Sequence, residues 1–312
     1  MGLELKSLRV AYGEALVELG RQNENIVVLE ADLGKSTMSC LFQQAFPGRY
    51  FEMGIAEQNM ASVAAGLSLT GKIPFISTFA VFVSGRAYDQ IRQSIAIPNL
   101  NVNICGSSSG LSDFGDGATH QAVEDAAIMR AIPNMTVLVP ADAVETRRMV
   151  FAMAGFPGPC YLRVNRSDLP VLTEDEPFIV GKMNVLRSGG DAAIFANGVM
   201  VSKALRAAEL LEIDGISAKV INASTIKPMD PDQVSGLVNG VKAVVTAEEH
   251  SIVGGLGAAV SQALQGGACP PVAYVGIQDR FGMSARNYDE LLEHCGLTER
   301  AIADAVKKGM GA

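Results

Sequence analysis

The chain has 312 residues, 48% of them hydrophobic, with 32 glycines and no tryptophan, a composition typical of a tightly turned α/β protein with a large buried sheet. A chain of this length forms about two domains. Its net charge of −8 gives no electrostatic footprint for nucleic acid and argues against a role at an anionic membrane surface, so we expect neither partner.

Helical and strand-like patterns alternate along the first half of the chain. Residues 4–20 have apolar positions at helical spacing and end at Gly20, and the apolar run at 26–33 predicts a buried strand. Further helices are predicted at 56–70, 84–96, 122–131 and 143–154, and further strands at 73–77, 101–106, 136–140 and 160–164. This order predicts a mostly parallel sheet with helices on both faces, closed by the strand at 160–164.

Residues 165–181 combine prolines with clustered acids, and we interpret them as a linker, after which the alternation starts again. In this second half, strands are predicted at 191–198, 217–224, 242–250 and 271–279, and helices at 200–212, from Pro231 onward, at 252–265 and at 298–308. The predicted fold is therefore α/β with two domains, residues 1–172 and 173–312, each a mostly parallel sheet flanked by helices.

The stretch Tyr50–Arg92 is the most informative part of the first half. Glu57 opens a run of small residues that predicts a buried helix, and an apolar strand pattern follows, ending at Phe79 and Phe82. A charged side chain is costly to bury, so Glu57 should have a specific partner. On the pattern alone, Glu57 is also compatible with a glutamate that satisfies free N–H groups at a helix start, and the two phenylalanines with core packing.

Two loops follow predicted strands and are candidate edges of a ligand site, because ligands of open α/β sheets bind beyond the carboxyl ends of strands. The first contains Ser36. The second, DFGDGATHQ, contains Asp116 and His120, and the glycines beside Asp116 let the backbone approach a small ligand closely. A histidine here can transfer protons near neutral pH, although a helix-capping or loop histidine fits the sequence equally well.

Cysteine usage and the N-terminal sequence favour a cytoplasmic protein. The five cysteines are widely scattered and show no CxxC pair or metal-ligand spacing, which favours a reducing compartment and predicts no metal site in this chain alone. The N-terminus, MGLELKSLRV, is too charged for a signal peptide, and no apolar run reaches the roughly 18–20 residues of a membrane span. We therefore expect a soluble cytoplasmic chain.

The segment GIAEQNM, followed further on by STFAVFVSGRAYDQIR, resembles the pyrimidine-binding domain of transketolases and related thiamine-diphosphate enzymes. The second half, through DRFGMSARNYDELLEHCGLT, resembles the transketolase C-terminal domain, so the resemblance covers essentially the full chain. It implies that Glu57 hydrogen-bonds the ring nitrogen of the cofactor's aminopyrimidine and activates the cofactor. It also implies that Phe79 and Phe82 lie beside that ring and that Asp32 is a further cofactor contact.

The same resemblance implies a sugar site. Asp116 would contact a sugar hydroxyl, and His120 would act as a catalytic group beside the reacting carbonyl oxygen. Arg9, Ser36 and Arg166 match positions at which transketolases hold a sugar phosphate, and the planar fork of arginine suits a phosphate because it donates two hydrogen bonds at once.

Some positions leave the assignment open. Arg163 is close enough in sequence to Arg166 for the two to exchange roles. Ser108 is assigned to the substrate site at a position where the family often has a phosphate-contacting histidine, and Gly85 replaces an aromatic residue that commonly flanks the pyrimidine. These departures bear on the substrate more than on the cofactor.

Two glycine motifs do not predict further sites. The GDG at 115–117 also opens the diphosphate and magnesium motif of these enzymes, but no Asn-Asn pair follows it, so we assign it to the sugar loop and expect a partner to hold diphosphate and Mg²⁺. In the second half, the glycine-rich turn at 254–257 suggests an anion site, but it lacks the spacing of a dinucleotide fingerprint. We interpret His250 as structural, and by the resemblance this half supports assembly rather than chemistry.

Together these features predict the C-terminal subunit of a transketolase split over two chains. It would transfer a two-carbon ketol unit from a ketose phosphate to an aldose phosphate, as in the pentose phosphate pathway, only with a separate diphosphate-binding N-terminal subunit, in an α2β2 assembly. The alternatives are a subunit like 1-deoxyxylulose-phosphate synthase, the β subunit of a 2-oxo-acid dehydrogenase, or a non-catalytic homologue. The donor and acceptor sugars stay open, and Ser108 allows a specialised sugar pathway.

Overall fold

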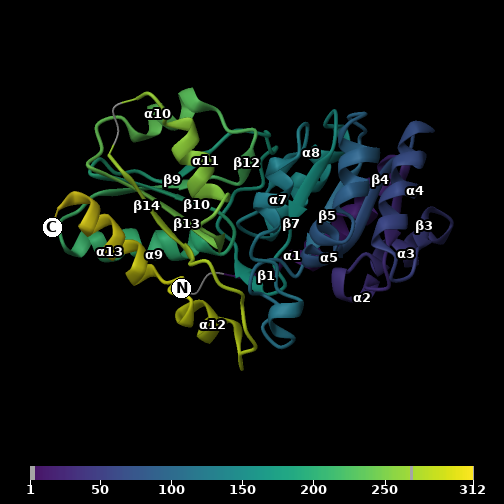
Figure 1. Cartoon of the computed structure of the whole chain (residues 1–312), viewed down its shortest axis with the longest axis horizontal. Coiled ribbons are helices and arrows are strands. Elements are labelled where there is room, and N and C mark those ends of the chain that lie inside the picture. Colours follow the sequence, from purple (N-terminus) through teal and green to yellow (C-terminus); the bar gives the residue numbers. More distant parts are fainter. Residues whose placement is uncertain (1–3, 268–269, 312) are drawn as a thin grey trace.

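Two sheets lie side by side along the long axis of the computed structural model, which describes residues 4–267 and 270–311 (Figure 1). The N-terminal half (purple to teal) contains most of the first sheet, and the C-terminal half (green to yellow) contains the second. Both sheets are mostly parallel and carry helices on their faces, which confirms the predicted fold. The boundary predicted between residues 172 and 173 falls between β8 (Asp168–Pro170) and β9 (Asn184–Arg187), and stays a prediction.

The first sheet has the strand order β12-β6-β7-β5-β4-β2-β3. Its strands from the N-terminal half all run parallel: β2 (Ile26–Glu30), β3 (Tyr50–Glu52), β4 (Ile73–Phe79), β5 (Asn103–Ser107), β6 (Thr136–Leu138) and β7 (Cys160–Arg163). Parallel strands are covered on both faces, so their sequences are continuous apolar runs, and all residues of β2 are buried. This is why the sequence located most of these strands.

The prediction that residues 160–164 close the first sheet is wrong. β7 lies in the interior between β5 and β6, and the strand beyond β6 is β12 (Thr225–Lys227), which comes from the C-terminal half and runs antiparallel to β6. The pairing continues where the amide of Val139 donates to the carbonyl of Ser224 at 2.7 Å. A strand this short carries too few residues for a pattern. Its pairing fixes the two halves to each other.

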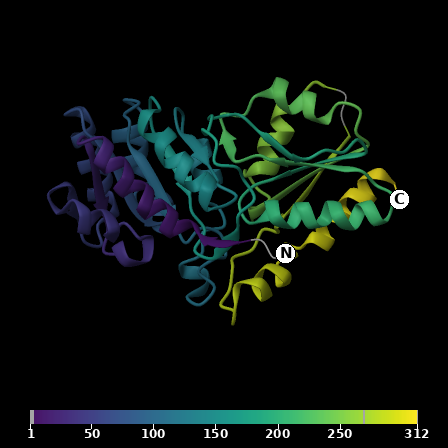
Figure 2. The ribbon, with the colours of Figure 1, turned by 180° about the vertical axis from the view of Figure 1, so that it is seen from behind.

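Helices cover both faces of the first sheet. One face carries α1 (Leu8–Gln22) and α8 (Ala143–Gly155), and Figure 2 shows α1 (purple) in front of the sheet when the molecule is seen from behind. The other face carries α4 (Glu57–Leu69), α5 (Ala80–Gly85), α6 (Tyr88–Gln90), the π-helical segment η2 (Ile91–Ala96) and α7 (Asp125–Ala131). Successive residues of a strand point to opposite faces, so Val28 shares an apolar cluster with Leu16 of α1 and Leu29 shares one with Met60 of α4.

Two helices differ from their predicted forms. The helix predicted at 84–96 is divided between α5, α6 and η2, with Gly85 ending the first segment, since glycine is a poor helix former. The helix predicted at 4–20 begins only at Leu8, after the strand β1 (Leu5–Ser7). Ser7 caps that helix, because its hydroxyl accepts a hydrogen bond from the amide of Val10 at 3.4 Å.

The segment interpreted as a linker contains β8, which pairs antiparallel with β1 so that Ser7 lies opposite Asp168. This register places Arg9, two residues after Ser7, beside Arg166, two residues before Asp168. Residues near the start of the chain and residues after the first domain's last parallel strand therefore meet at one place. The pairing explains how two arginines so far apart in sequence reach the same site.

The second sheet has the order β14-β13-β10-β11-β9, in which only the edge strand β9 is antiparallel to its neighbour. Its parallel strands are β10 (Ala192–Ala196), β11 (Ala218–Asn222), β13 (Ala243–Ser251) and β14 (Val272–Ile277). One face packs against α9 (Met200–Ile213) and α13 (Glu299–Met310), and the other against α10 (Pro231–Val238) and α11 (Leu256–Ala263). None of the helices in the described ranges is long and apolar enough to cross a membrane.

The two halves also share an apolar core. One cluster of buried side chains includes Leu111 and Val164 from the first half together with Val199 and Tyr288 from the second. The remaining short elements are α2 (Gly34–Thr37), α3 (Cys40–Ala45), the 3-10 turns η1 (Pro47–Arg49) and η3 (Gly117–Thr119), and α12 (Tyr288–His294). The contact between the halves is therefore packed as well as hydrogen-bonded.

Candidate functional site

Glu57 is the first residue of α4, and only 3% of it is exposed. Its Oε1 accepts a hydrogen bond from Nη1 of Arg86 at 3.0 Å, and the guanidinium of Arg86 lies 4.0 Å from the ring centroid of Phe82. Half of the Arg86 side chain is exposed to solvent. The buried carboxylate therefore has the specific partner that its burial requires.

A cavity of about 560 Å³ opens beside this carboxylate. Residues 55–59 and Arg86 form its wall, and Ile55 is 74% exposed at its rim. A buried acid at the wall of an open cavity can share a proton with a ligand that enters, while water has little access to the acid itself.

Three aromatic rings lie together, and one of them, that of Phe82, contacts the Arg86 guanidinium that binds Glu57. Phe79 ends β4 and Phe82 lies in α5, and their rings stack with centroids 5.7 Å apart and planes 19° from parallel. The imidazole of His120, from the loop after β5, stands edge-on to both, at 5.4 Å from Phe82 and 6.2 Å from Phe79. Neighbouring parallel strands end at the same edge of a sheet, which is why residues from β4 and from the loop after β5 meet here.

The arginines lie on the far side of the same rings. The guanidinium carbon of Arg166 lies 6.0 Å from the centroid of Phe79, and its Nη1 binds Oδ2 of Asp113 at 2.7 Å. Arg9 donates from Nε to the carbonyl of Arg166 at 3.2 Å and from Nη1 to the carbonyl of Ser36 at 2.7 Å. Burial lowers the pKa of Arg9 and the charge of Arg166 lowers it further, while the charges of Asp168 and Asp113 oppose this shift. Two neighbouring cations of this kind favour an anionic ligand.

The structure thus brings most predicted site residues into one row, which we call the site row. It contains Glu57, Phe82, Phe79, His120, Arg166, Arg9 and Ser36, each in contact with the next or with a shared neighbour. The row runs from a buried acid, across aromatic rings, to paired guanidinium groups. It can hold a flat heterocycle at one end and an anion at the other.

Three predicted residues lie at the margin of the site row. Asp32 is exposed, with a left-handed φ of 60°, and its amide donates to Oε1 of Glu52 at 2.8 Å. Asp116 is exposed at the start of η3. Ser108 is fully buried with a φ of 51°, and its hydroxyl has no hydrogen-bond partner in the described structure. A left-handed serine with an unpaired buried hydroxyl is strained, and it reaches a ligand only if this turn rearranges.

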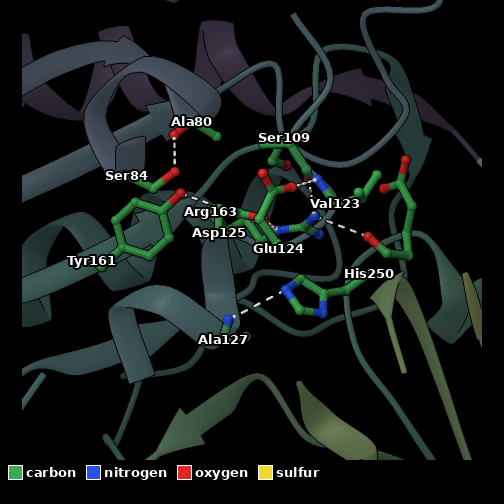
Figure 3. Close-up of polar contacts among 12 residues, drawn as sticks. Ala80, Ser84, Ser109, Val123, Glu124, Asp125, Ala127, Tyr161, Arg163 and His250 are labelled. Carbon is green, nitrogen blue, oxygen red and sulfur yellow. Dashed lines mark hydrogen bonds and ion pairs between the residues drawn. The ribbon is translucent and has the colours of Figure 1, made fainter. Parts of the chain in front are cut away.

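Arg163 does not take the place of Arg166. It is buried, its Nε binds both carboxylate oxygens of Asp125 at 2.9 and 3.0 Å, and Figure 3 shows the two side chains beside Tyr161. Its Nη2 donates to the carbonyls of Ala122 and Glu249. With these donors engaged inside the protein, Arg163 is a structural residue.

The sequence did not single out three residues that complete the site. Arg86 and Asp113 are the ion-pair partners of Glu57 and Arg166. Glu30, at the end of β2, is fully buried and accepts hydrogen bonds from the hydroxyls of Ser39 at 2.5 Å and Thr37 at 2.8 Å. Burial raises the pKa of Glu30 to about 7. Glu30 therefore holds the turn that carries Ser36, and a lone acid in an apolar run gave no signal of that role.

The glycine-rich turn of the second half is not an anion site. The carboxylate of Glu248 accepts hydrogen bonds from the amides of Leu256 at 2.7 Å and Gly257 at 2.8 Å, so the start of α11 is already capped by an acid of the chain. His250 is buried, and its Nε2 accepts from the amide of Ala127 at 3.2 Å, as Figure 3 shows. Across the described ranges, no group of three or more His, Cys, Asp or Glu side chains could hold a metal ion.

Residues 5–171 match the family model for the transketolase pyrimidine binding domain, and residues 181–302 match that for the transketolase C-terminal domain. The chain is 45% identical to the "Putative transketolase C-terminal section" of Methanocaldococcus jannaschii, with 98% of this chain and 96% of that protein covered. It is 42% identical to the 6-deoxy-6-sulfo-D-fructose transketolase subunit SqwH of Clostridium sp. (strain MSTE9), with 97% and 94% covered.

Longer relatives and a solved structure agree with these matches. The chain is 38% identical to the transketolase of Homo sapiens, covering 96% of this chain but 48% of that protein. A solved structure described as "Split gene transketolase, inactive beta4 tetramer" is 48% identical, with a TM-score of 0.89 and 99% of both chains covered. The predicted resemblance is confirmed.

Proposed function

Because the chain belongs to the transketolase family as a subunit of the split type, we propose that it transfers a two-carbon ketol unit from a ketose phosphate to an aldose phosphate, together with a separate diphosphate-binding subunit. The site row carries this proposal, since it pairs a buried acid and flat apolar rings with an anion site. The assembly is α2β2, and the four described cysteines, all free, support a cytoplasmic setting.

The cofactor is thiamine diphosphate, which supplies the carbon nucleophile that breaks and forms the C–C bond. Glu57 holds and exchanges a proton at the ring nitrogen of the aminopyrimidine, and its place at the wall of the 560 Å³ cavity supports this role. Phe79 and Phe82 offer the flat apolar surface beside the ring, and Asp32 is a further contact. The partner subunit binds the diphosphate and Mg²⁺.

The sugar lies along the rest of the site row. His120 moves a proton at the substrate carbonyl oxygen, and its nearness to the rings of Phe79 and Phe82 supports this role. Asp116 binds a hydroxyl, and Ser108 joins the site after a local rearrangement. Arg9, Ser36 and Arg166 hold the phosphate, since an anion between the two arginines relieves their mutual repulsion.

Reconstitution tests partner dependence. The chain alone should neither bind thiamine diphosphate measurably by calorimetry nor transfer ketol units from a pentulose phosphate to a pentose phosphate. Mixing with the diphosphate-binding subunit should raise the rate at least ~10³-fold, because half a site neither binds nor orients the cofactor. Activity of the isolated chain would refute the proposal. Release of CO₂ from pyruvate by the mixture, without ketol transfer, would favour the synthase-like or dehydrogenase-like alternatives.

Substituting Arg166→Ala tests the anion site. In the reconstituted enzyme, KM for phosphorylated sugars should rise about 10- to 100-fold, because a hydrogen bond to a charged group contributes about 1.5–3 kcal/mol. Rates with the corresponding unphosphorylated sugars should change little. Arg21→Ala, at an exposed position of α1, is the matched control.

The same assay, run with a ketose that carries a sulfonate in place of the phosphate, tells which anion the arginines prefer. The relative from Clostridium motivates this comparison by its name. Equal losses on phosphorylated and free sugars would remove the anion role from Arg166.

A further inference from the structure

Glu249, near the end of β13 in the C-terminal half, reaches the base of the loop that carries His120. Its side chain is buried, with 2% of the residue exposed. Oε1 accepts a hydrogen bond from the amide of Leu111 at 2.7 Å, and Oε2 accepts one from Nδ2 of Asn165 at 3.1 Å. Leu111 begins the loop that leads to His120, and Asn165 directly precedes Arg166. One carboxylate therefore binds both segments that present the sugar-site residues.

The base of this loop leaves little room for movement. Gly110 and Ala122 exchange two backbone hydrogen bonds of 3.0 Å each and so close the loop between them. Gly110 has a φ of 62°, and a Cβ atom there would lie 2.4 Å from Cδ of Glu249. Only glycine allows the carboxylate so close to the backbone. The close approach indicates that the carboxylate and the loop base fit as one unit.

The tip of the loop also rests on the C-terminal half, on the segment just before α12. The amide of Ala285 donates to the carbonyl of Phe114 at 2.9 Å, and Nε2 of Gln121 donates to the carbonyl of Met283 at 3.0 Å. A Cβ atom on Gly117 of η3 would lie 2.4 Å from Oγ of Ser284. The loop from Leu111 to Gln121 is thus bound by the C-terminal half at its base and at its tip.

A buried network holds Glu249 itself in place. Nδ2 of Asn165 also donates to the hydroxyl of Tyr288 at 2.7 Å, and the backbone carbonyl of Glu249 accepts from Nη2 of Arg163 at 2.9 Å. Burial raises the pKa of Glu249 to about 7, while the charge of Arg163 opposes that rise. Side chains from β7, from the loop after it and from α12 therefore hold Glu249 against the loop, with Arg163 binding its backbone and Asn165 its carboxylate.

We infer that Glu249 is a positioning residue, which sets the His120 loop and Arg166 relative to each other from the opposite domain. The C-terminal half thereby takes part in site geometry, in addition to supporting assembly. The consequence for turnover rests on the proposed function, whereas the consequence for loop order rests only on the contacts of Glu249. These two consequences can be measured separately.

The matched control is Asn222→Ala. Asn222 is also buried, lies in the C-terminal half and binds an N-terminal carboxylate, that of Glu145, at 3.0 and 3.1 Å. Within the described ranges its side chain binds Glu145 and makes no hydrogen bond to the His120 loop, so its loss disturbs the domain contact elsewhere. Glu249→Gln is the conservative variant, since its amide oxygen can still accept from the amide of Leu111.

Hydrogen exchange, measured by mass spectrometry on the full chain, reports directly how well the His120 loop is ordered. Peptides that cover residues 108–123 should exchange at least about tenfold faster in Glu249→Ala than in the wild type, with most protection recovered in Glu249→Gln. Asn222→Ala should leave these peptides unchanged. Unchanged exchange in Glu249→Ala, or an equal increase in Asn222→Ala, would overturn the inference.

Kinetics of the reconstituted enzyme measure the consequence for turnover. Glu249→Ala should lower kcat/KM for ketol transfer about 10- to 100-fold, because small displacements of positioned groups are costly to rate. Affinity for thiamine diphosphate should stay within about twofold, and Glu249→Gln should restore most of the rate. Should the wild-type mixture transfer no ketol unit, the proposed function fails, and the exchange measurement still decides the positioning role.

Discussion

Replacing Glu57 with glutamine is expected to lower ketol transfer by the reconstituted enzyme by about 10²–10⁴-fold, the usual range for loss of a proton-transferring group. Glutamine has nearly the same shape, and its amide oxygen can still accept the hydrogen bond from Arg86 that the carboxylate accepts at 3.0 Å. It cannot give or take a proton at a ring nitrogen. The loss should therefore appear in kcat at saturating cofactor.

Rates should be measured with saturating partner subunit, cofactor and sugars, so that weaker binding does not imitate a chemical defect. Glu14→Gln, an exposed position on α1, removes the same charge away from the site row and should leave the rate unchanged. The melting temperature of both variants shows whether they fold. A Glu57→Gln enzyme with a rate within twofold of the wild type would exclude the proton role of this acid.

The strands that the sequence located were those whose burial leaves a pattern. A strand such as β2 is buried along its whole length, and its sequence is apolar from Ile26 to Leu29. The strands β1, β8 and β12 have three residues each and, unlike β6, are not buried along their whole length, so they leave no such run. They form because the fold brings a partner strand from elsewhere in the sequence beside each of them. That is why sequence reasoning placed a linker where β8 lies and missed the strand shared between the halves.

The site residues also divide into those that the local sequence indicates and those that only the fold reveals. Glu57, Phe79 and His120 stand out locally, as an acid in an apolar run, a ring at a strand end and a histidine among glycines. Their partners do not, because each partnership joins distant positions. Arg86 lies 29 residues from Glu57, Asp113 lies 53 residues from Arg166, and Glu249 lies 138 residues from Leu111. The sequence alone does not show which of its many charged residues form ion pairs, whereas the folded structure does.

Glu249 also changes the interpretation of the second half. The sequence of the second half resembles a domain that supports assembly. Its strand β13, however, supplies the carboxylate of Glu249, which binds the segments leading to His120 and to Arg166. The shared strand β12 and the shared apolar cluster hold that carboxylate at a fixed distance from the first sheet. The contact between the halves therefore serves both roles of the second half: it supports assembly, and it sets the geometry of the site.

A buried ion pair within the first half, between Asp125 of α7 and Arg163 of β7, lies beside that contact, and breaking it should have the largest effect on stability. Asp125 is fully buried and Arg163 nearly so, and the Tyr161 hydroxyl also donates to Asp125, at 2.7 Å (Figure 3). The substitution Asp125→Ala leaves a buried guanidinium without its counter-charge and a hydroxyl without its acceptor. We expect a loss of about 3–5 kcal/mol in the free energy of unfolding.

Denaturant unfolding followed by two spectroscopic probes measures this loss and tests whether the two halves unfold together. Glu212→Ala is the matched control, because Arg187 binds Glu212 at 2.7 Å on the surface, where 73% of the glutamate side chain is exposed. Water screens that pair, so its loss should cost at most about 1 kcal/mol. The double substitution Asp125→Ala, Arg163→Met should recover part of the stability, since it removes the uncompensated charge.

If Asp125→Ala costs no more than Glu212→Ala, or if the double variant is no more stable than Asp125→Ala alone, the buried pair is not a main source of the chain's stability. The two pairs have similar geometry, with nitrogen–oxygen distances of 2.9 Å inside and 2.7 Å on the surface. A large difference between them therefore reflects burial, together with the additional hydrogen bond that Asp125 accepts from the Tyr161 hydroxyl. The same burial makes Arg163 a fixed donor to the carbonyl of Glu249, and so connects the stability of the chain to the geometry of its site.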